Sequence, residues 1–194
     1  GSDDNRLYAI GTDGKTRDGF PTRTGGDVFS SPLLMDGHIL FGSDDGRIHA
    51  VDRLGRPAPG WPVETGGFVS ASPVPLRAGE DAPLAIGSWD GNLYVLDKAG
   101  RHLPGWPAKA GFPIWSSAAV ADIDGDGQPE IAVATDRLFV LRSDATPLSG
   151  FPAQLDAYAV GSPAIGDIDR DGRLEIIVAS DRVYGFRDDG RPMD

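Results

Sequence analysis

The chain has 194 residues, 40% of them hydrophobic and 24% charged, which is the composition of a foldable globular protein. A net charge of −11 argues against nucleic acid as a partner, because phosphate binding needs a basic face, and no apolar run reaches the length of a membrane span. The absence of cysteine excludes disulfides and thiol chemistry, and 27 glycines with 16 prolines favour turns and short strands over long helices.

An internal repeat organises the whole chain. The tripeptides GFP or GWP begin at positions 19, 60, 105 and 150, and each is followed by one of the small segments SSP, ASP, SSA or GSP. Each period predicts four short strands, of which the first is small and apolar. The second and third are apolar at both alternate positions, so both of their faces should be buried. The fourth carries the aromatic–Pro pair, and since proline cannot donate a ladder hydrogen bond, this strand belongs at an edge.

Four-stranded sheets that repeat in this way predict an all-β fold, a β-propeller with about four repeats in a single domain over residues 1–194. Serines of the first strand fit the crowded central axis, and Trp61, Trp106, Phe20 and Phe151 fit the wide rim between blades. A β-solenoid or a pair of sandwiches does not explain a small inner strand combined with an aromatic–Pro outer one. In chain order we expect a partial blade at 6–24, blades at 30–65, 71–109 and 117–153, and an incomplete blade at 162–187.

The closure of the ring stays open at this point. The partial blade supplies a third and a fourth strand, and the incomplete blade lacks its outer strand. The ring could close within one chain as four blades, or a homodimer could form a ring of eight blades, or the chain could belong to a longer ring. Closure of any kind removes exposed strand edges. The duplicated third strand, at 6–10 and 182–186, leaves all three closures open, and we slightly favour the dimer.

Two acidic loops connect the first and second strands of the last two blades. They read DIDGDGQPE at 122–130 and DIDRDGRLE at 167–175, with acids at positions 1, 3, 5 and 9 and glycine at position 6. Carboxylates spaced by two around a sharp turn can converge on calcium, which takes six to eight oxygen ligands, whereas turn preference alone does not demand this pattern. The residue at position 7 would contribute its backbone carbonyl. The sequence therefore predicts two Ca²⁺ sites, whose ligands are Asp122, Asp124, Asp126, Gln128 and Glu130 in one loop and Asp167, Asp169, Asp171, Arg173 and Glu175 in the other.

The runs SSAAVADIDGDGQPEIAVAT and GSPAIGDIDRDGRLEIIVAS resemble the FG-GAP or VCBS repeats of bacterial propellers, which are related to the head of integrin α-subunits. Earlier segments such as GSWDGNLYVLD are more similar to PQQ-type propeller repeats. The resemblance implies structural calcium in the DxDxDGxxD/E loops and a secreted, periplasmic or cell-surface location in bacteria. It indicates little about activity, because such propellers serve many roles.

No catalytic set stands out in the sequence. His38, His49 and His102 are the only imidazoles, and the serines recur at one inner-strand position instead of forming one activated nucleophile. We therefore expect no enzyme activity and a calcium-stabilised propeller that acts in protein interaction or adhesion. The alternatives are a lectin that binds glycans near Trp89 and Trp115, and a fragment of a PQQ-dependent dehydrogenase.

Overall fold

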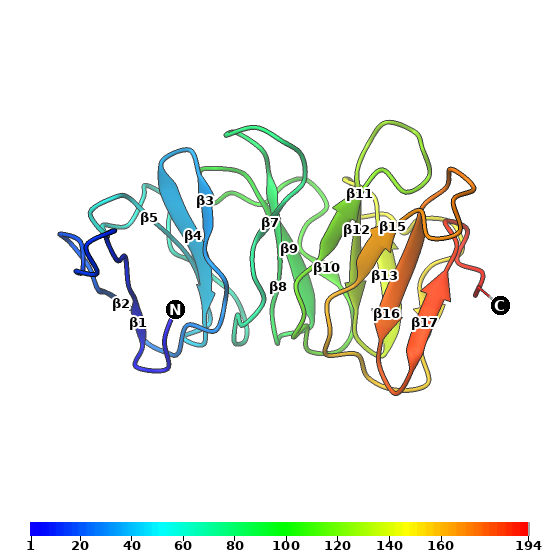
Figure 1. Ribbon diagram of the computed structural model, residues 1–194, viewed down its shortest axis with the longest axis horizontal. Helices are drawn as coiled ribbons and strands as arrows, with labels where there is room; N and C mark the ends of the chain where they lie inside the picture. Colours follow the sequence, from blue (N-terminus) through cyan, green and yellow to red (C-terminus); the bar gives the residue numbers. More distant parts are fainter. Residues whose placement is uncertain (194) are drawn as a thin grey trace.

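The computed structural model describes residues 1–193, which form antiparallel β-sheets arranged one after another (Figure 1). These residues contain no helix, and so none that is long and apolar enough to cross a membrane. Every sheet is a meander in which each strand pairs with the next one along the chain. The prediction of an all-β propeller built of four-stranded blades is confirmed.

The strands fall into five groups. The N-terminal pair contains β1 (Arg6–Leu7) and β2 (Thr22–Arg23). The first blade contains β3 (Leu33–Met35), β4 (His38–Ser43), β5 (Arg47–Val51) and β6 (Val63–Glu64). The second blade contains β7 (Val74–Pro75), β8 (Leu84–Gly87), β9 (Asn92–Leu96) and β10 (Ala108–Lys109). The third blade contains β11 (Ala119–Ala121), β12 (Glu130–Ala134), β13 (Arg137–Leu141) and β14 (Ala153–Gln154), and the C-terminal sheet contains β15 (Ala164–Gly166), β16 (Glu175–Ala179) and β17 (Val183–Phe186).

The hydrophobic core lies between the blades. In β8, Ile86 packs in a cluster with Ile48 and Trp61 of the first blade, whereas the adjacent Ala85 packs in a cluster with Ile131 of the third blade. Successive side chains of a strand point to opposite faces, so a strand that is apolar at every position needs a neighbour on each side. This is why β8 and β12 are buried at every residue and why the blades pack face to face.

The aromatic residues before each outer-strand proline join neighbouring blades at the rim. Trp61 and Trp106 are each 7% exposed, and their indole N–H groups donate to the carbonyls of Lys98 (3.2 Å) and Ser143 (2.9 Å) of the following blade. Gly60 precedes the first of these tryptophans with φ of +87°, and a Cβ there would lie 2.2 Å from the carbonyl oxygen of Ala99. A glycine is therefore required at this position both by its backbone conformation and by the close approach of the next blade.

A chain of serine hydrogen bonds runs from blade to blade on the inner side. The backbone N–H of Ser31 donates to Oγ of Ser72 (2.9 Å), that of Ser72 to Oγ of Ser117 (2.9 Å), and that of Ser117 to Oγ of Ser162 (3.1 Å). We call this series the serine ladder. It explains the recurrence of serine at one position of each repeat, because an alanine there would leave the N–H group of the preceding blade without its acceptor.

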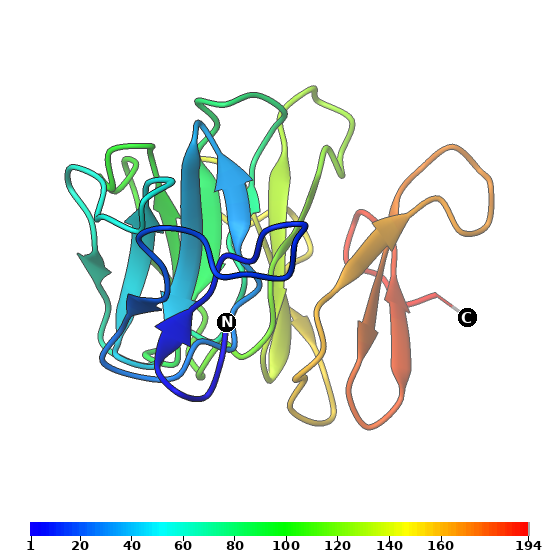
Figure 2. The same cartoon turned by 60° about the vertical axis from the view of Figure 1, so that its left-hand side comes forward.

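The two ends of the described chain do not pair with each other. The N-terminal pair and the C-terminal sheet are separate sheets, and they lie at opposite ends of the row of blades (Figures 1 and 2). The structure thus does not contain the four-bladed ring closed within one chain, which is one of the closures that the sequence allows.

We predict that Ser117→Ala lowers the free energy of unfolding by about 1 kcal/mol, the usual net contribution of one intramolecular hydrogen bond, because the N–H of Ser72 loses its acceptor. Chemical denaturation measures this effect. Ser149→Ala is the control, since Ser149 is exposed and makes no side-chain hydrogen bond within residues 1–193. Equal stability of the two variants would show that the ladder contributes nothing.

Candidate metal sites and an exposed aromatic surface

The two acidic loops lie on the same side of the molecule. They form the β11–β12 and β15–β16 connections, along the upper edge in Figure 1, whereas the β16–β17 hairpin points to the lower edge. Successive turns of an antiparallel meander alternate between the two ends of a blade. The connections between first and second strands therefore gather on one face of the propeller, and the hairpins between second and third strands gather on the other.

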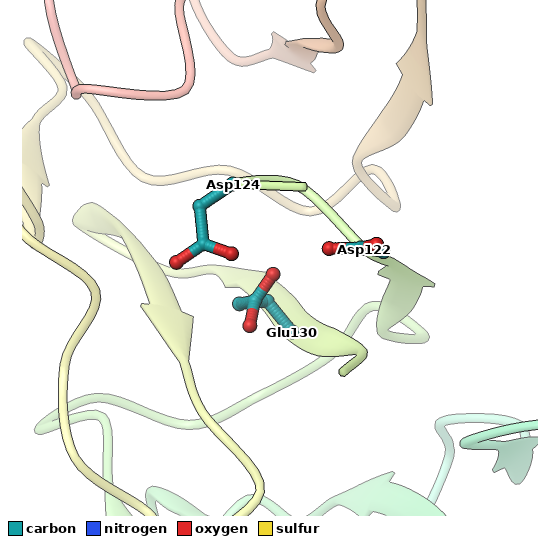
Figure 3. Close-up of side chains that lie close together, drawn as sticks. All are labelled: Asp122, Asp124 and Glu130. Atoms are coloured by element: carbon teal, nitrogen blue, oxygen red, sulfur yellow. The ribbon is translucent and has the colours of Figure 1, made fainter. Parts of the chain in front are cut away.

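Three acidic side chains converge in each loop. Carboxylate oxygens of Asp122, Asp124 and Glu130 all lie within 4.8 Å of one another (Figure 3). The equivalent residues of the second loop, Asp167, Asp169 and Glu175, form the same group. Within each loop, the fold thus brings the side chains at positions 1, 3 and 9 close to one another.

Position 5 of each loop has a different environment. Asp126 and Asp171 do not belong to the convergent groups; their Oδ1 atoms accept the backbone N–H of Gln128 (2.7 Å) and Arg173 (2.8 Å), two residues further on. The guanidinium of Arg173 pairs with Asp188, with 3.0 Å between Nε and Oδ2. That the backbone carbonyl oxygens of Gln128 and Arg173 bind the metal stays a prediction.

The same hydrogen bonds from backbone N–H groups to carboxylate side chains stabilise both loops. The N–H of Gly127 donates to Oδ2 of Asp122 at 2.9 Å, and the N–H of Ile123 donates to Oε2 of Glu130 at 2.8 Å. The second loop repeats both bonds, at 3.1 Å from Gly172 to Asp167 and at 2.9 Å from Ile168 to Glu175. The acidic side chains are therefore positioned by the loop itself.

Glu130 has an unsatisfied carboxylate oxygen. The residue is 1% exposed, and its Oε1 is buried without a hydrogen-bond partner among residues 1–193. Burial raises the pKa of Glu130, and the neighbouring charges of Asp124 and Asp126 raise it further. A buried anionic acceptor beside two more carboxylates fits a hard divalent cation such as calcium, which binds oxygen ligands of this kind.

An arginine faces each acidic loop from the end of the third strand. Arg142 Nη2 lies 3.0 Å from Oδ2 of Asp124, and Arg187 Nη1 lies 3.6 Å from Oδ2 of Asp169. The first and second blades have the acidic Asp52 and Asp97 at this position, and their connections lack the acidic motif. The change from aspartate to arginine between the earlier and later repeats is visible in the sequence, but it was not among the predictions. Exposed pairs of this kind compensate the loop charge only weakly, because solvent screens them.

The opposite face carries two groups of aromatic side chains. The ring centroids of Trp89 and Trp115 are 3.9 Å apart, those of Phe68 and Trp89 are 5.1 Å apart, and those of Phe112 and Tyr158 are 6.3 Å apart. We call these five residues the aromatic surface; they come from the β8–β9 hairpin and from the connections between blades. Phe68, Phe112 and Trp115 are 45%, 50% and 44% exposed. Exposed aromatic side chains that are grouped in this way are typical of binding surfaces.

Two polar groups of the aromatic surface lack partners. The indole Nε1 of Trp89 and the hydroxyl of Tyr158 are buried atoms without a hydrogen bond among residues 1–193. Burial, with a smaller effect of the Asp136 charge, raises the pKa of Tyr158 to about 12, so its hydroxyl stays protonated at neutral pH. Buried tryptophan and tyrosine usually pair these groups, so both unpaired donors oppose the burial of their side chains.

Four-stranded meanders that pack face to face around a line of small residues define this chain as a β-propeller. Residues 114–140 match the FG-GAP repeat, over the span that contains the first acidic loop, which confirms the resemblance predicted there. The crystal structure of BamB from Moraxella catarrhalis is similar, with a TM-score of 0.73 and 19% sequence identity over 98% of this chain and 54% of that chain. The chain thus spans about half the length of that protein, and the likeness shows the fold. Comparison with curated proteins finds no match.

We predict that Glu130→Gln, measured in EDTA at neutral pH, raises the free energy of unfolding by about 1 kcal/mol, because an unpaired buried charge costs more than an unpaired neutral amide. Glutamine can keep the bond from Ile123 N–H while it removes a buried charge beside Asp124 and Asp126. Glu64→Gln is the control, because Glu64 is exposed in β6. Destabilisation by Glu130→Gln in EDTA would show that the carboxylate is satisfied without metal.

Proposed function

We propose that this protein is a non-enzymatic β-propeller that binds a protein partner through the aromatic surface, while calcium in the two acidic loops stabilises the opposite face. The observation that carries the proposal is the group of three aromatic side chains, each between 44% and 50% exposed, on one face of a rigid scaffold. Aromatic residues are enriched at protein interfaces, where a few large side chains contribute most of the binding energy.

The environment of His49 supports a non-catalytic role for this residue. His49 stacks on Phe41 with ring centroids 5.0 Å apart, and its Nε2 lies 3.1 Å from Oδ2 of Asp45. Burial lowers the pKa of His49, although the Asp45 charge opposes this effect. An imidazole held between a phenyl ring and a carboxylate within one blade serves packing, and no serine hydroxyl is hydrogen-bonded to it within residues 1–193.

Calcium in both acidic loops is supported by the converging carboxylates and by the unsatisfied Oε1 of Glu130. Asp122, Asp124 and Glu130 would hold the ion in one loop, and Asp167, Asp169 and Glu175 would hold it in the other. A hard cation would neutralise the repulsion among these carboxylates and would fix the first strand to the second. The role of the calcium ion would be structural, because it supplies positive charge to the loop and fixes the loop conformation.

A secreted, periplasmic or cell-surface location, with a role in adhesion, fits this reading. Extracellular calcium-binding modules work with dissociation constants of about 10⁻⁴ to 10⁻³ M, so short loops with few ligands are adequate there. The FG-GAP repeat at residues 114–140 supports the same proposal. We also propose that a second copy of the chain completes the ring, because the two ends of the described residues belong to separate sheets.

We predict that millimolar calcium raises the melting temperature by about 5 to 10 °C relative to EDTA, since each of two sites at about ten times its dissociation constant stabilises the native state by about 1.4 kcal/mol. Asp122→Asn and Asp167→Asn should each remove about half of this shift. Asp36→Asn, in the equivalent connection of the first blade, is the matched control. The same melting temperature in calcium and in EDTA would refute structural calcium.

We predict that peptides selected from a displayed library against the wild-type protein bind Trp115→Ala and Phe112→Ala at least about tenfold more weakly, because truncation of a central aromatic residue costs about 1.4 kcal/mol or more. Fluorescence anisotropy with the selected peptides measures the affinity. The control is Phe29→Ala, since Phe29 is 58% exposed but does not belong to the aromatic surface. If a glycan array instead gives binding that Trp115→Ala abolishes, the protein is a lectin.

A further inference from the structure

One position of the repeat changes its charge together with the acidic loops. It is the residue directly after the third strand, which is Asp52 in the first blade, Asp97 in the second, Arg142 in the third and Arg187 after β17. The repeats with aspartate have ordinary connections between their first and second strands, and the repeats with arginine have the acidic loops. Because the two differences occur in the same repeats, the charge at this position has to be explained together with the loop.

The backbone at this position is the same in all four repeats. In each of them the backbone N–H donates to the carbonyl oxygen four residues further on, over 2.8 or 2.9 Å, from the donors Asp52, Asp97, Arg142 and Arg187. The turn therefore forms equally well with aspartate and with arginine, so the choice between them depends on the side chain.

The side chain at this position has a different role in the third blade. In the first blade, Oδ1 of Asp52 accepts the N–H of Arg56 at 3.0 Å and so caps the turn. In the third blade this role passes to Asp144, whose Oδ1 accepts the N–H of Thr146 at 3.0 Å. Arg142 is therefore not needed as a cap, and its side chain can contact the acidic loop.

The guanidinium of Arg142 lies against the first acidic loop. Its Nη2 donates to Oδ2 of Asp124 at 3.0 Å, and its Nη1 donates to the carbonyl oxygen of Pro147 at 3.4 Å. The side chains of Arg142 and Asp124 are 37% and 25% exposed, so solvent screens this pair only in part. Asp124 is one of the three acids that converge in the loop. A positive charge is thus held beside the place where calcium would bind.

A positive charge beside a cation site has two opposite effects. It reduces the repulsion among the carboxylates of the loop, which stabilises the loop without calcium. It also repels the calcium ion, and this repulsion is twice that on a monovalent ion at the same distance because the ion carries two charges. Screening at a partly exposed site keeps both effects moderate.

We propose that Arg142 sets the calcium affinity of the first acidic loop: its charge stabilises the loop before the ion binds and weakens the binding of the ion. This rests on the calcium binding proposed above and names a residue that controls it. The second loop repeats the arrangement, since Nη1 of Arg187 lies 3.6 Å from Oδ2 of Asp169 and 3.8 Å from Oδ2 of Asp171.

The experiment measures calcium dissociation constants by isothermal titration calorimetry. Asp167→Asn is the parent protein, so that the first loop alone is titrated. Arg142→Gln in this parent should bind calcium about three- to tenfold more tightly, because it removes the charge and keeps most of the side-chain length. Arg142→Lys should bind calcium as the parent does, since lysine carries the same charge.

Two further measurements separate the effect of charge from a change in structure. The gain of Arg142→Gln should shrink in about 1 M potassium chloride, where the Debye length is about 3 Å. In EDTA, Arg142→Gln should have a lower melting temperature than the parent, because the carboxylates of the loop lose a counter-charge.

Arg137→Gln is the matched control. Arg137 begins the same strand, β13, five residues before Arg142, so it lies about 16 Å away along an extended chain. This distance exceeds the Debye length of about 8 Å at physiological ionic strength, so the calcium affinity should not change.

The outcomes distinguish this role of Arg142 from the calcium sites themselves. Equal or weaker calcium binding by Arg142→Gln would overturn the role of Arg142 alone. A gain in affinity by Arg142→Lys as large as that by Arg142→Gln would also overturn it, because the charge is then irrelevant. Absence of calcium binding by the wild-type protein would overturn both this role and the proposed calcium sites.

Discussion

The burial of both faces of every sheet is the constraint on which the rest of the structure depends. A blade of this chain cannot be stable alone, because Ile86 and Ala85, adjacent in one strand, belong to cores on opposite sides of it. Each blade therefore needs two neighbours, and the row continues until something covers its ends. The rim tryptophans and the serine ladder add hydrogen bonds between blades, but they act where apolar packing has already brought the blades together.

The antiparallel meander separates two kinds of chemistry. Turns between first and second strands lie on one face and carry the acidic loops, whereas turns between second and third strands lie on the other face beside the aromatic surface. The residues of the two faces can therefore change independently, because the blade between them is a rigid packed layer. The first and second blades illustrate this freedom: they keep the fold with ordinary turns in place of the acidic loops.

The candidate metal sites could be predicted only in part. Spacing alone identified positions 1, 3 and 9 of both loops, because a short loop around a glycine limits where those side chains can point. It did not separate Asp126 and Asp171 from the convergent groups, since an aspartate in a turn can cap backbone N–H groups as readily as it can bind a cation. Arg142 and Arg187 were missed because their contact with the loops depends on how the third strand ends against the first connection.

The sequence by itself determined the repeat, the all-β class, the four-stranded blades and the positions of the acidic loops, because strand periodicity, proline and glycine act locally. Only the tertiary structure decided which residues lie on one face, because Phe68, Trp89, Phe112, Trp115 and Tyr158 come from different repeats and meet only when blades pack. It also decided that the ends of the described chain stay apart and that Arg142 lies against Asp124. Contact is a property of what lies beside a residue in space, and a repeat in the sequence does not say which side chains meet.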